Sequence, residues 1–177
     1  MAGAMLTPIP AASVIVLRDA PLEVLLLRRN DASSFVPGAW VFPGGAIEDG
    51  ESPAVAAARE TFEEAGLQLD PDELVLTSRW ITPEGIPKRF DTCFFLARVA
   101  RDAHVTIDGR EIVESIWLTP ADALARKDLK LVFPTIRNLE ALTAFESVEA
   151  LIESRRGAVI EPIQPVLVNG KPTLVSS

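Results

Sequence analysis

Short apolar runs separated by turn residues extend from residue 11 to residue 118 and predict β-strands. Residues 11–18 combine β-branched and small apolar side chains, as a buried strand does. Residues 22–28 follow a turn at 19–21. Their leucines also suit a helix, but the proline and turn residues beside them favour an antiparallel hairpin. The same pattern predicts further strands at residues 40–42, 74–81, 89–99 and 112–118.

A helix is predicted between residues 53 and 65, where the apolar period changes from two to about 3.6. Ser52 suits the N-cap, Pro53 suits the first helical position, and Gly66 can take the left-handed conformation that ends a helix. On a wheel of about 100° per residue, an apolar side expected to face the core lies opposite an acidic side. The apolar side holds Val55, Ala58, Phe62 and Ala65, and the acidic side holds Glu60, Glu63 and Glu64.

The C-terminal part of the chain is predicted to be helical and then extended. Capping residues and periodicity predict a helix from Pro120 behind Thr119, a helix at 131–145 and a helix at 147–155. Residues 157–177 are apolar and punctuated by prolines, so we expect an extended tail that covers the core or contributes to a homodimer. Residues 1–10 should form an N-terminal arm. Strands and then helices predict an α+β fold, in one domain over residues 1–177.

The composition is that of a globular protein without a disulfide framework. The chain has 177 residues, of which 48% are hydrophobic and 24% are charged. A net charge of −8 argues against a nucleic-acid or anionic-membrane partner. Cys93 is expected in a buried strand, and His104, the single histidine, is expected at the surface. No apolar run is long enough for a membrane span and no basic signal segment begins the chain, so we expect a cytoplasmic protein.

Acidic residues are concentrated around the helix at 53–65. Nine acidic residues and a single basic residue, Arg59, lie between Glu48 and Glu73. Clustered carboxylates repel one another, and hard oxygen ligands suit Mg²⁺ or Mn²⁺. The alternative is an ordinary solvated acidic helix face. The spacing of the surrounding residues decides between the two.

The stretch from residue 45 to residue 67 resembles the Nudix box of the MutT-like hydrolases. Thr61 is the one departure, at a position where an aliphatic residue is usual. The resemblance covers roughly residues 11–130, and it implies an α/β/α sandwich around a mixed sheet. It also implies divalent-metal-dependent cleavage of a P–O–P linkage in a nucleoside diphosphate derivative, a small-molecule substrate. The matching positions are Gly45, Glu51, Arg59, Glu60, Glu63, Glu64, Gly66 and Leu67.

The resemblance also implies roles for individual residues. Glu60 and Glu64 would be the main metal ligands, joined by Glu63 and by the backbone carbonyl of Gly44. Arg59 would orient these carboxylates by ion pairing, with Glu51 as a further partner. A carboxylate outside the box is often needed. Glu114 is the first candidate and Glu111 the second, although either could be an exposed strand residue.

Substrate signals are fewer, and they partly resemble those of CoA diphosphatases. Arg29, Gly38 and residues 42–45 match that extra motif. Leu27, Asn30 and Ser34 depart from it. A second stretch, with residues 80–83 and 88–92, looks like a branch that contains a CoA diphosphatase of animals.

The second stretch also supplies cations and leaves other substrates open. Lys88 and Arg89 would bind substrate phosphate, or they are ordinary loop cations. CoA or acyl-CoA is therefore the first substrate predicted. An ADP-ribose or NADH pyrophosphatase, marked weakly by Pro83, is the alternative, and a non-catalytic ligand-binding module is the second alternative.

Overall fold

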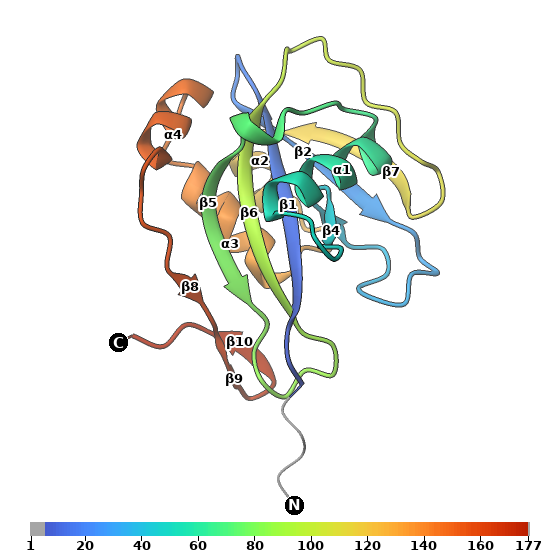
Figure 1. Cartoon of the computed structure of the whole chain (residues 1–177), viewed down its shortest axis with the longest axis vertical. Helices are drawn as coiled ribbons and strands as arrows, with labels where there is room; N and C mark the ends of the chain where they lie inside the picture. Colours follow the sequence, from blue (N-terminus) through green and yellow to red (C-terminus); the bar gives the residue numbers. More distant parts are fainter. Residues whose placement is uncertain (1–5, 177) are drawn as a thin grey trace, which may run out of the picture.

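The computed structural model describes residues 6–176 and shows a mixed β-sheet with helices on both faces (Figure 1). Within these residues eight strands form the sheet in the order β3-β2-β1-β6-β5-β8, with β4 beside β1 and β7 beside β2. β1 runs parallel to β6 and antiparallel to β2 and β4. The strands are β1 Ile9–Arg18, β2 Glu23–Arg29, β3 Trp40–Val41, β4 Gly44–Ala46, β5 Val75–Ile81, β6 Phe90–Arg98, β7 Ile112–Leu118 and β8 Pro162–Ile163.

The central strand β1 shows why both faces of the sheet are covered. Successive side chains of a strand point to opposite faces. Val14 and Val16 pack into the core beneath one helix, whereas Ile15 and Leu17 pack into the core beneath three others, and all four side chains are fully buried. The first layer is α1 Pro53–Ala65, and the second is α2 Pro120–Ala125, α3 Phe133–Leu142 and α4 Val148–Arg155. The predicted α+β fold, an α/β/α sandwich around a mixed sheet, is confirmed.

The observed strands and helices begin and end within three residues of most predicted boundaries. The hairpin of β1 and β2 is confirmed, with Leu17 opposite Val24. A further short strand that was not predicted, β4, follows residues 40–42, and its Gly44 pairs with Ser13. β1 starts at Ile9, inside the expected arm, and residues 1–5 of that arm lie outside the described residues.

The C-terminal tail was predicted to be extended, and in the structure parts of it form paired strands. β8 runs parallel to β5, and a hairpin of β9 (Val166–Val168) and β10 (Lys171–Thr173) follows it. Figure 1 shows this hairpin beyond the ends of β5 and β6. Dimerisation through the tail stays a prediction. Across residues 6–176, no helix has the length and apolar character needed to cross a membrane.

The boundaries of α1 match the prediction, but its buried side matches only in part, because Ala58 and Ala65 are buried as predicted. Ser52 Oγ accepts a hydrogen bond from the N–H of Val55, and Gly66 ends the helix with φ of 69°. Val55 and Phe62, predicted to face the core, are 43% and 57% exposed. The small side chains of α1 lie against the sheet instead and let the helix approach it closely. The buried residues are Ala56, Ala57, Ala58, Thr61, Glu64 and Ala65.

Thr61, the residue that departs from the Nudix box, lies on this buried side. Its side chain is fully buried, and its Oγ1 donates a hydrogen bond of 2.8 Å to the carbonyl of Ala57, one turn earlier in α1. A buried hydroxyl that is hydrogen-bonded carries little penalty. The helix therefore accommodates threonine where an aliphatic residue is usual.

Candidate active site

Two glycines bring β4 directly against the carboxylates of α1. The N–H of Gly44 donates a hydrogen bond of 2.9 Å to Glu64 Oε2. A Cβ on Gly45 would lie 2.6 Å from the carboxylate carbon of Glu60, and a Cβ on Gly44 would lie 2.1 Å from Ser13 Oγ. Such distances are shorter than any van der Waals contact. The missing side chain of Gly45 thus leaves room for the carboxylate of Glu60, and that of Gly44 lets β4 lie directly against β1.

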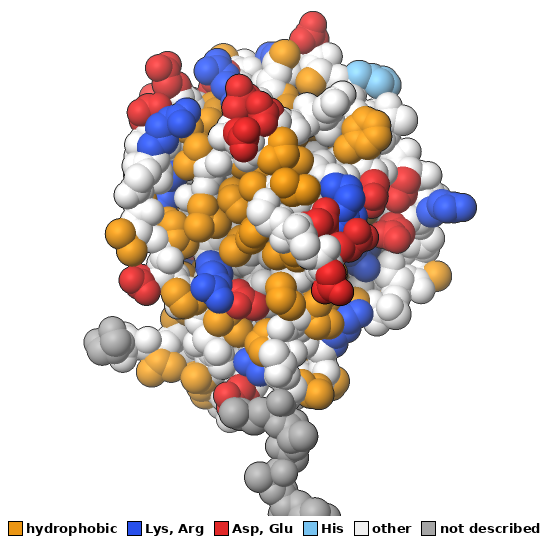
Figure 2. All heavy atoms as spheres, viewed as in Figure 1, with side chains coloured by type: hydrophobic (Ala, Val, Ile, Leu, Met, Phe, Trp, Pro, Cys, Tyr) orange, Lys and Arg blue, Asp and Glu red, His pale blue; other side chains and the backbone are white. Residues whose placement is uncertain are grey.

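Arg59 holds three of the predicted site carboxylates. Its Nε and Nη2 each donate a hydrogen bond of 2.9 Å to the carboxylate of Glu51, and its Nη1 lies 3.0 Å from Glu60 and 3.4 Å from Glu63. The bidentate pairing with Arg59 lowers the pKa of Glu51 to about 2. Figure 2 shows acidic side chains gathered around basic ones on this face of the molecule.

Glu64 is the buried carboxyl of the cluster, and Glu60 beside it is half-buried. Burial raises the pKa of Glu60, although Arg59 opposes the shift. Glu64 is 3% exposed, and desolvation raises its pKa to about 8 against the opposing Gly44 N–H, with repulsion from Glu60 and Glu111 adding to the shift. Two adjacent carboxyls that are costly to ionise together form an environment that a cation would stabilise.

The three glutamates predicted as metal ligands do not all share one partner. Glu60 and Glu63 turn to Arg59, whereas Glu64 accepts its hydrogen bond from Gly44. Among residues 6–176, no three His, Cys, Asp or Glu side chains converge as a group that would hold a metal ion. Metal binding by these residues stays a prediction.

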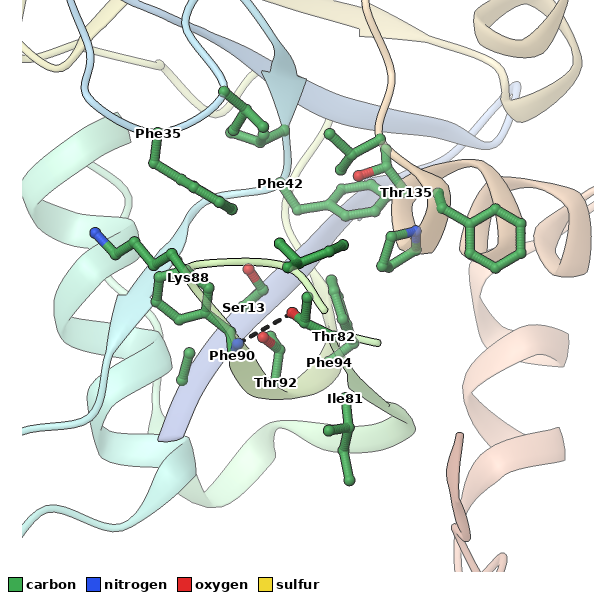
Figure 3. A pocket seen from close by; sticks show the side chains of 18 of the residues that line it. Ser13, Phe35, Phe42, Ile81, Thr82, Lys88, Phe90, Thr92, Phe94 and Thr135 are labelled. Atoms are coloured by element: carbon green, nitrogen blue, oxygen red, sulfur yellow. Dashed lines mark hydrogen bonds between the residues drawn. The ribbon is translucent and has the colours of Figure 1, made fainter. Parts of the chain in front are cut away.

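A cavity of about 490 Å³ opens next to the glycines of β4, on the α3 side of the sheet (Figure 3). Gly44, Gly45 and Arg29 line the end of it that adjoins the carboxylates, and Arg29 also acts electrostatically on Glu64. Lys88 lines the cavity with its ammonium group 5.7 Å and 5.5 Å from the rings of Phe35 and Phe90. The remaining lining is mostly aromatic and aliphatic, and includes Val36, Phe42, Ile81, Pro83, Ile86, Phe94, Val132 and Phe133.

The NUDIX domain profile matches residues 7–139. The chain belongs to the NUDIX family. Putative nudix hydrolase 7 of Caenorhabditis elegans is 27% identical to it over 154 residues, which span 64% of this chain and 52% of that protein. The m7GpppN-mRNA hydrolase NUDT17 of Danio rerio is 31% identical over 118 residues, or 59% and 39% of the two lengths. The chain therefore spans about half or less of these curated relatives.

A solved NUDIX hydrolase has the same fold over nearly its whole length. The crystal structure from Alicyclobacillus acidocaldarius superposes with a TM-score of 0.74 and 30% sequence identity. The match covers 85% of this chain and 97% of that one. The Nudix fold inferred from the box alone is thus the observed fold.

The structure separates the two candidates for a carboxylate outside the Nudix box. Glu114 lies on β7 opposite Arg28, and its exposed carboxylate pairs with that arginine at 2.9 Å. Glu111 precedes β7, where its carbonyl accepts a hydrogen bond from the N–H of Asn30, and its charge raises the pKa of Glu64. Glu111, the second candidate from sequence, is therefore the one that acts on Glu60 and Glu64.

The two adjacent cations expected to bind substrate lie in different places. Lys88 is exposed and lines the cavity, whereas Arg89 is 7% exposed and is absent from the cavity lining that the described residues form. Arg89 donates hydrogen bonds of 3.0 Å to the carbonyl of Thr82 and 2.8 Å to that of Leu6. Both residues belong to the loop before β6, where Lys88 faces the cavity and Arg89 is held by two backbone carbonyls, so the structure does not bring Arg89 to the cavity.

Several cavity residues were given no role from the sequence, although Thr92 lies in the second stretch that resembles the CoA diphosphatases. Ser13 and Thr92 add hydroxyls from adjacent strands, and Thr135 adds another from the first turn of α3. Pro165 and Pro172 come from the tail, beyond the residues matched by the Nudix family. Alternation in β1 and β6 could have placed Ser13 and Thr92 on one face, but no local pattern links α3 or the tail to the Nudix box.

Proposed function

We propose that this chain is a Nudix hydrolase that cleaves a P–O–P linkage with the help of Mg²⁺ or Mn²⁺. The observation that carries the proposal is the pair of carboxyls, the buried Glu64 and the half-buried Glu60, that lie against the glycines of β4, which line a cavity together with Arg29. Family membership supports the reaction class, since the matched relatives are named as hydrolases.

The donor set fits a hard divalent cation. Glu60 and Glu64 would hold it, with Glu63, the carbonyl of Gly44 and the carboxylate of Glu111 as further oxygen ligands. Carboxylate and carbonyl oxygens are the ligands that Mg²⁺ and Mn²⁺ prefer. When bound, the ion supplies charge neutralisation and lowers the pKa of a coordinated water.

The residues of the chain itself supply orientation and phosphate binding. Arg59 fixes Glu51 through two hydrogen bonds and restrains Glu60 and Glu63, which reduces the freedom of those carboxylates. Arg29 lines the cavity and donates a hydrogen bond from its Nε to the carbonyl of Phe35. Together with Lys88, it gives a substrate diphosphate positive charge in a protein of net charge −8.

Among diphosphate substrates we propose CoA or acyl-CoA as the first class. The support is the apolar lining of the cavity, which suits a pantetheine or acyl group better than the two polar halves of ADP-ribose or NADH. The relative named as an m7GpppN-mRNA hydrolase makes a cap structure a further compound to test.

The test is a hydrolysis panel with Mg²⁺ and with Mn²⁺, with products separated by chromatography. The compounds are CoA, octanoyl-CoA, ADP-ribose, NADH and a cap dinucleotide. Release of 3′,5′-ADP from the CoA compounds, with the others largely intact, is the expected result. AMP from ADP-ribose or NADH would move the substrate to the alternative class, and no product with either metal would favour a ligand-binding module.

The same panel needs two variants to tie turnover to the site. Glu64→Gln should lower kcat by more than about 100-fold, because a lost metal ligand removes several kcal/mol of transition-state stabilisation. Glu153→Gln is the matched control, since Glu153 is an exposed glutamate of α4 paired with Arg156. Equal activity of both variants would contradict the assignment of the site.

A further inference from the structure

The far wall of the cavity comes from a part of the chain outside the Nudix match. The family profile ends at residue 139, yet Pro165 and Pro172 line the cavity from the C-terminal tail. Pro165 is buried and lies between β8 and β9. In Figure 1 the hairpin of β9 and β10 lies well apart from β4, which marks the carboxylate end of the cavity.

The hairpin has an inner and an outer face. Leu167 on β9 pairs with Pro172 on β10, and both are partly buried, whereas Val166 and Val168 point away and are 44% and 48% exposed. Leu167 lies against the loop between β5 and β6, where a Cβ on Gly85 would be 3.4 Å from its Cδ1. Because an isolated two-stranded hairpin is barely stable in water, this packing against the loop and the cavity rim holds it in place.

The chemistry of the lining defines what the cavity accepts. Among the described residues that line it, charge is carried by Arg29 and Lys88 alone, and no carboxylate or side-chain amide is present. Figure 3 shows Phe35 and Phe90 on one side and Phe42 and Phe94 on the other, directed into the same space. The uncharged polar side chains of the lining are the hydroxyls of Ser13, Thr82, Thr92 and Thr135, and the rest is mostly apolar, so the cavity suits an uncharged apolar group better than a base or a sugar.

We propose that the C-terminal hairpin limits the length of an apolar group that the substrate carries next to its phosphates. This inference rests on the proposed function for the position of the phosphates, at Arg29 and the glycines of β4. The apolar group then extends along the aromatic walls to Pro165 and Pro172. The tail, which the Nudix profile does not include, thereby acts as the specificity-determining wall.

The test measures binding of a homologous series by calorimetry, so it does not depend on cleavage. Ethyl, butyl, hexyl, octyl and decyl phosphate contain no P–O–P bond. Affinity should rise about fourfold for each methylene that enters an apolar site, and then level off once the chain reaches the hairpin. Affinity that does not change with chain length would overturn the inference.

Three variants locate the limit on the hairpin. Pro172→Phe adds bulk on the inner face and should move the plateau to shorter chains, whereas Val168→Phe adds bulk on the outer face and should leave it unchanged. Pro165→Ala removes part of the wall and should extend the plateau to longer chains. Identical shifts in the two phenylalanine variants would overturn the inference, and circular dichroism verifies that each variant is folded.

The outcome is separable from that of the proposed function. Binding that depends on chain length, without hydrolysis of any panel compound, would support the role of the hairpin and contradict the proposed hydrolase activity. Hydrolysis of a panel compound, together with an affinity for alkyl phosphates that does not depend on chain length, would support the hydrolase activity and contradict the role of the hairpin.

Discussion

Glu64 combines burial with a raised pKa, and this links the site to the stability of the fold. Its folded-state pKa is about 8, above the ordinary value of 4.5, so between these values the folded protein retains a proton that the unfolded chain has released. The free energy of unfolding should therefore fall as pH rises from about 4.5 to about 8, by at most about 5 kcal/mol, and then level off.

Urea denaturation in EDTA at about pH 5, 6.5 and 8 measures this dependence across the predicted window. Glu64→Gln should remove most of the slope, since glutamine does not titrate. Glu51 acts in another range, because its lowered pKa affects stability only as pH falls below 4.5 towards about 2. A slope that persists in the glutamine variant would assign the effect to another group.

The two glycines of β4 predict opposite results for the same substitution. In Gly45→Ala the new methyl group meets the carboxylate of Glu60, the flexible end of a side chain, so Glu60 can turn away at a cost below about 1 kcal/mol. In Gly44→Ala it meets the backbone of Ala12 and Ser13, which cannot turn away, so stability should fall by about 1–3 kcal/mol or more.

Thermal or urea unfolding and steady-state kinetics on both variants check this contrast. Gly45→Ala should retain its unfolding midpoint but lose turnover, since Glu60 is displaced from the site. If Gly45→Ala kept full activity, the position of Glu60 would not matter for the reaction.

At the scale of the element, α1 shows how far sequence reasoning reaches. Its ends depend on local chemistry in Ser52, Pro53 and Gly66, so they were predictable. Its buried side depends on what lies beneath it. Ala58 and Ala65 face the core as predicted, but Val55 and Phe62 do not, because the closeness of β1 and β4 selects small side chains.

In other elements too, features that depend on neighbouring residues were predictable, and features that depend on distant segments were not. The hairpin of β1 and β2 and the box spacing follow from neighbouring residues and were predicted. The pairing of β8 with β5, the strand character of Gly44–Ala46 and the position of Arg89 depend on segments far apart in the chain. The carboxylates of the candidate site were therefore found from sequence, whereas the cavity wall was not.

The rotation of α1 gives a stability prediction. Phe62→Ala should change the free energy of unfolding by less than about 1 kcal/mol, because the ring is already 57% exposed. Phe95→Ala is the matched control on the same side of the sheet, where a ring that is 8% exposed should cost about 3–5 kcal/mol. Urea denaturation measures both changes. A large loss of stability in Phe62→Ala would contradict the exposed position of that ring.

At the scale of the whole molecule, Arg89 ties together segments that are distant in the chain. It connects β6 to the loop after β5 and to Leu6, and its guanidinium is buried. Lys88, its neighbour, instead contributes exposed positive charge to a cavity in a protein of net charge −8. Arg89 therefore stabilises the fold, whereas Lys88 contributes charge to the cavity.

The pair Lys88→Met and Arg89→Met should separate these two contributions. Arg89→Met removes two hydrogen bonds of a buried guanidinium, to the carbonyls of Thr82 and Leu6, and should lower the free energy of unfolding by about 1–3 kcal/mol, with KM unchanged at temperatures where the variant is folded. Lys88→Met should leave stability unchanged and raise KM by up to about fivefold, the size of one solvent-screened charge contact. Urea denaturation and steady-state kinetics at two ionic strengths measure both, and the KM difference should shrink at the higher one because salt screens exposed charge. A KM increase in Arg89→Met with Lys88→Met unaffected would exchange their assignments and place the buried arginine in contact with substrate.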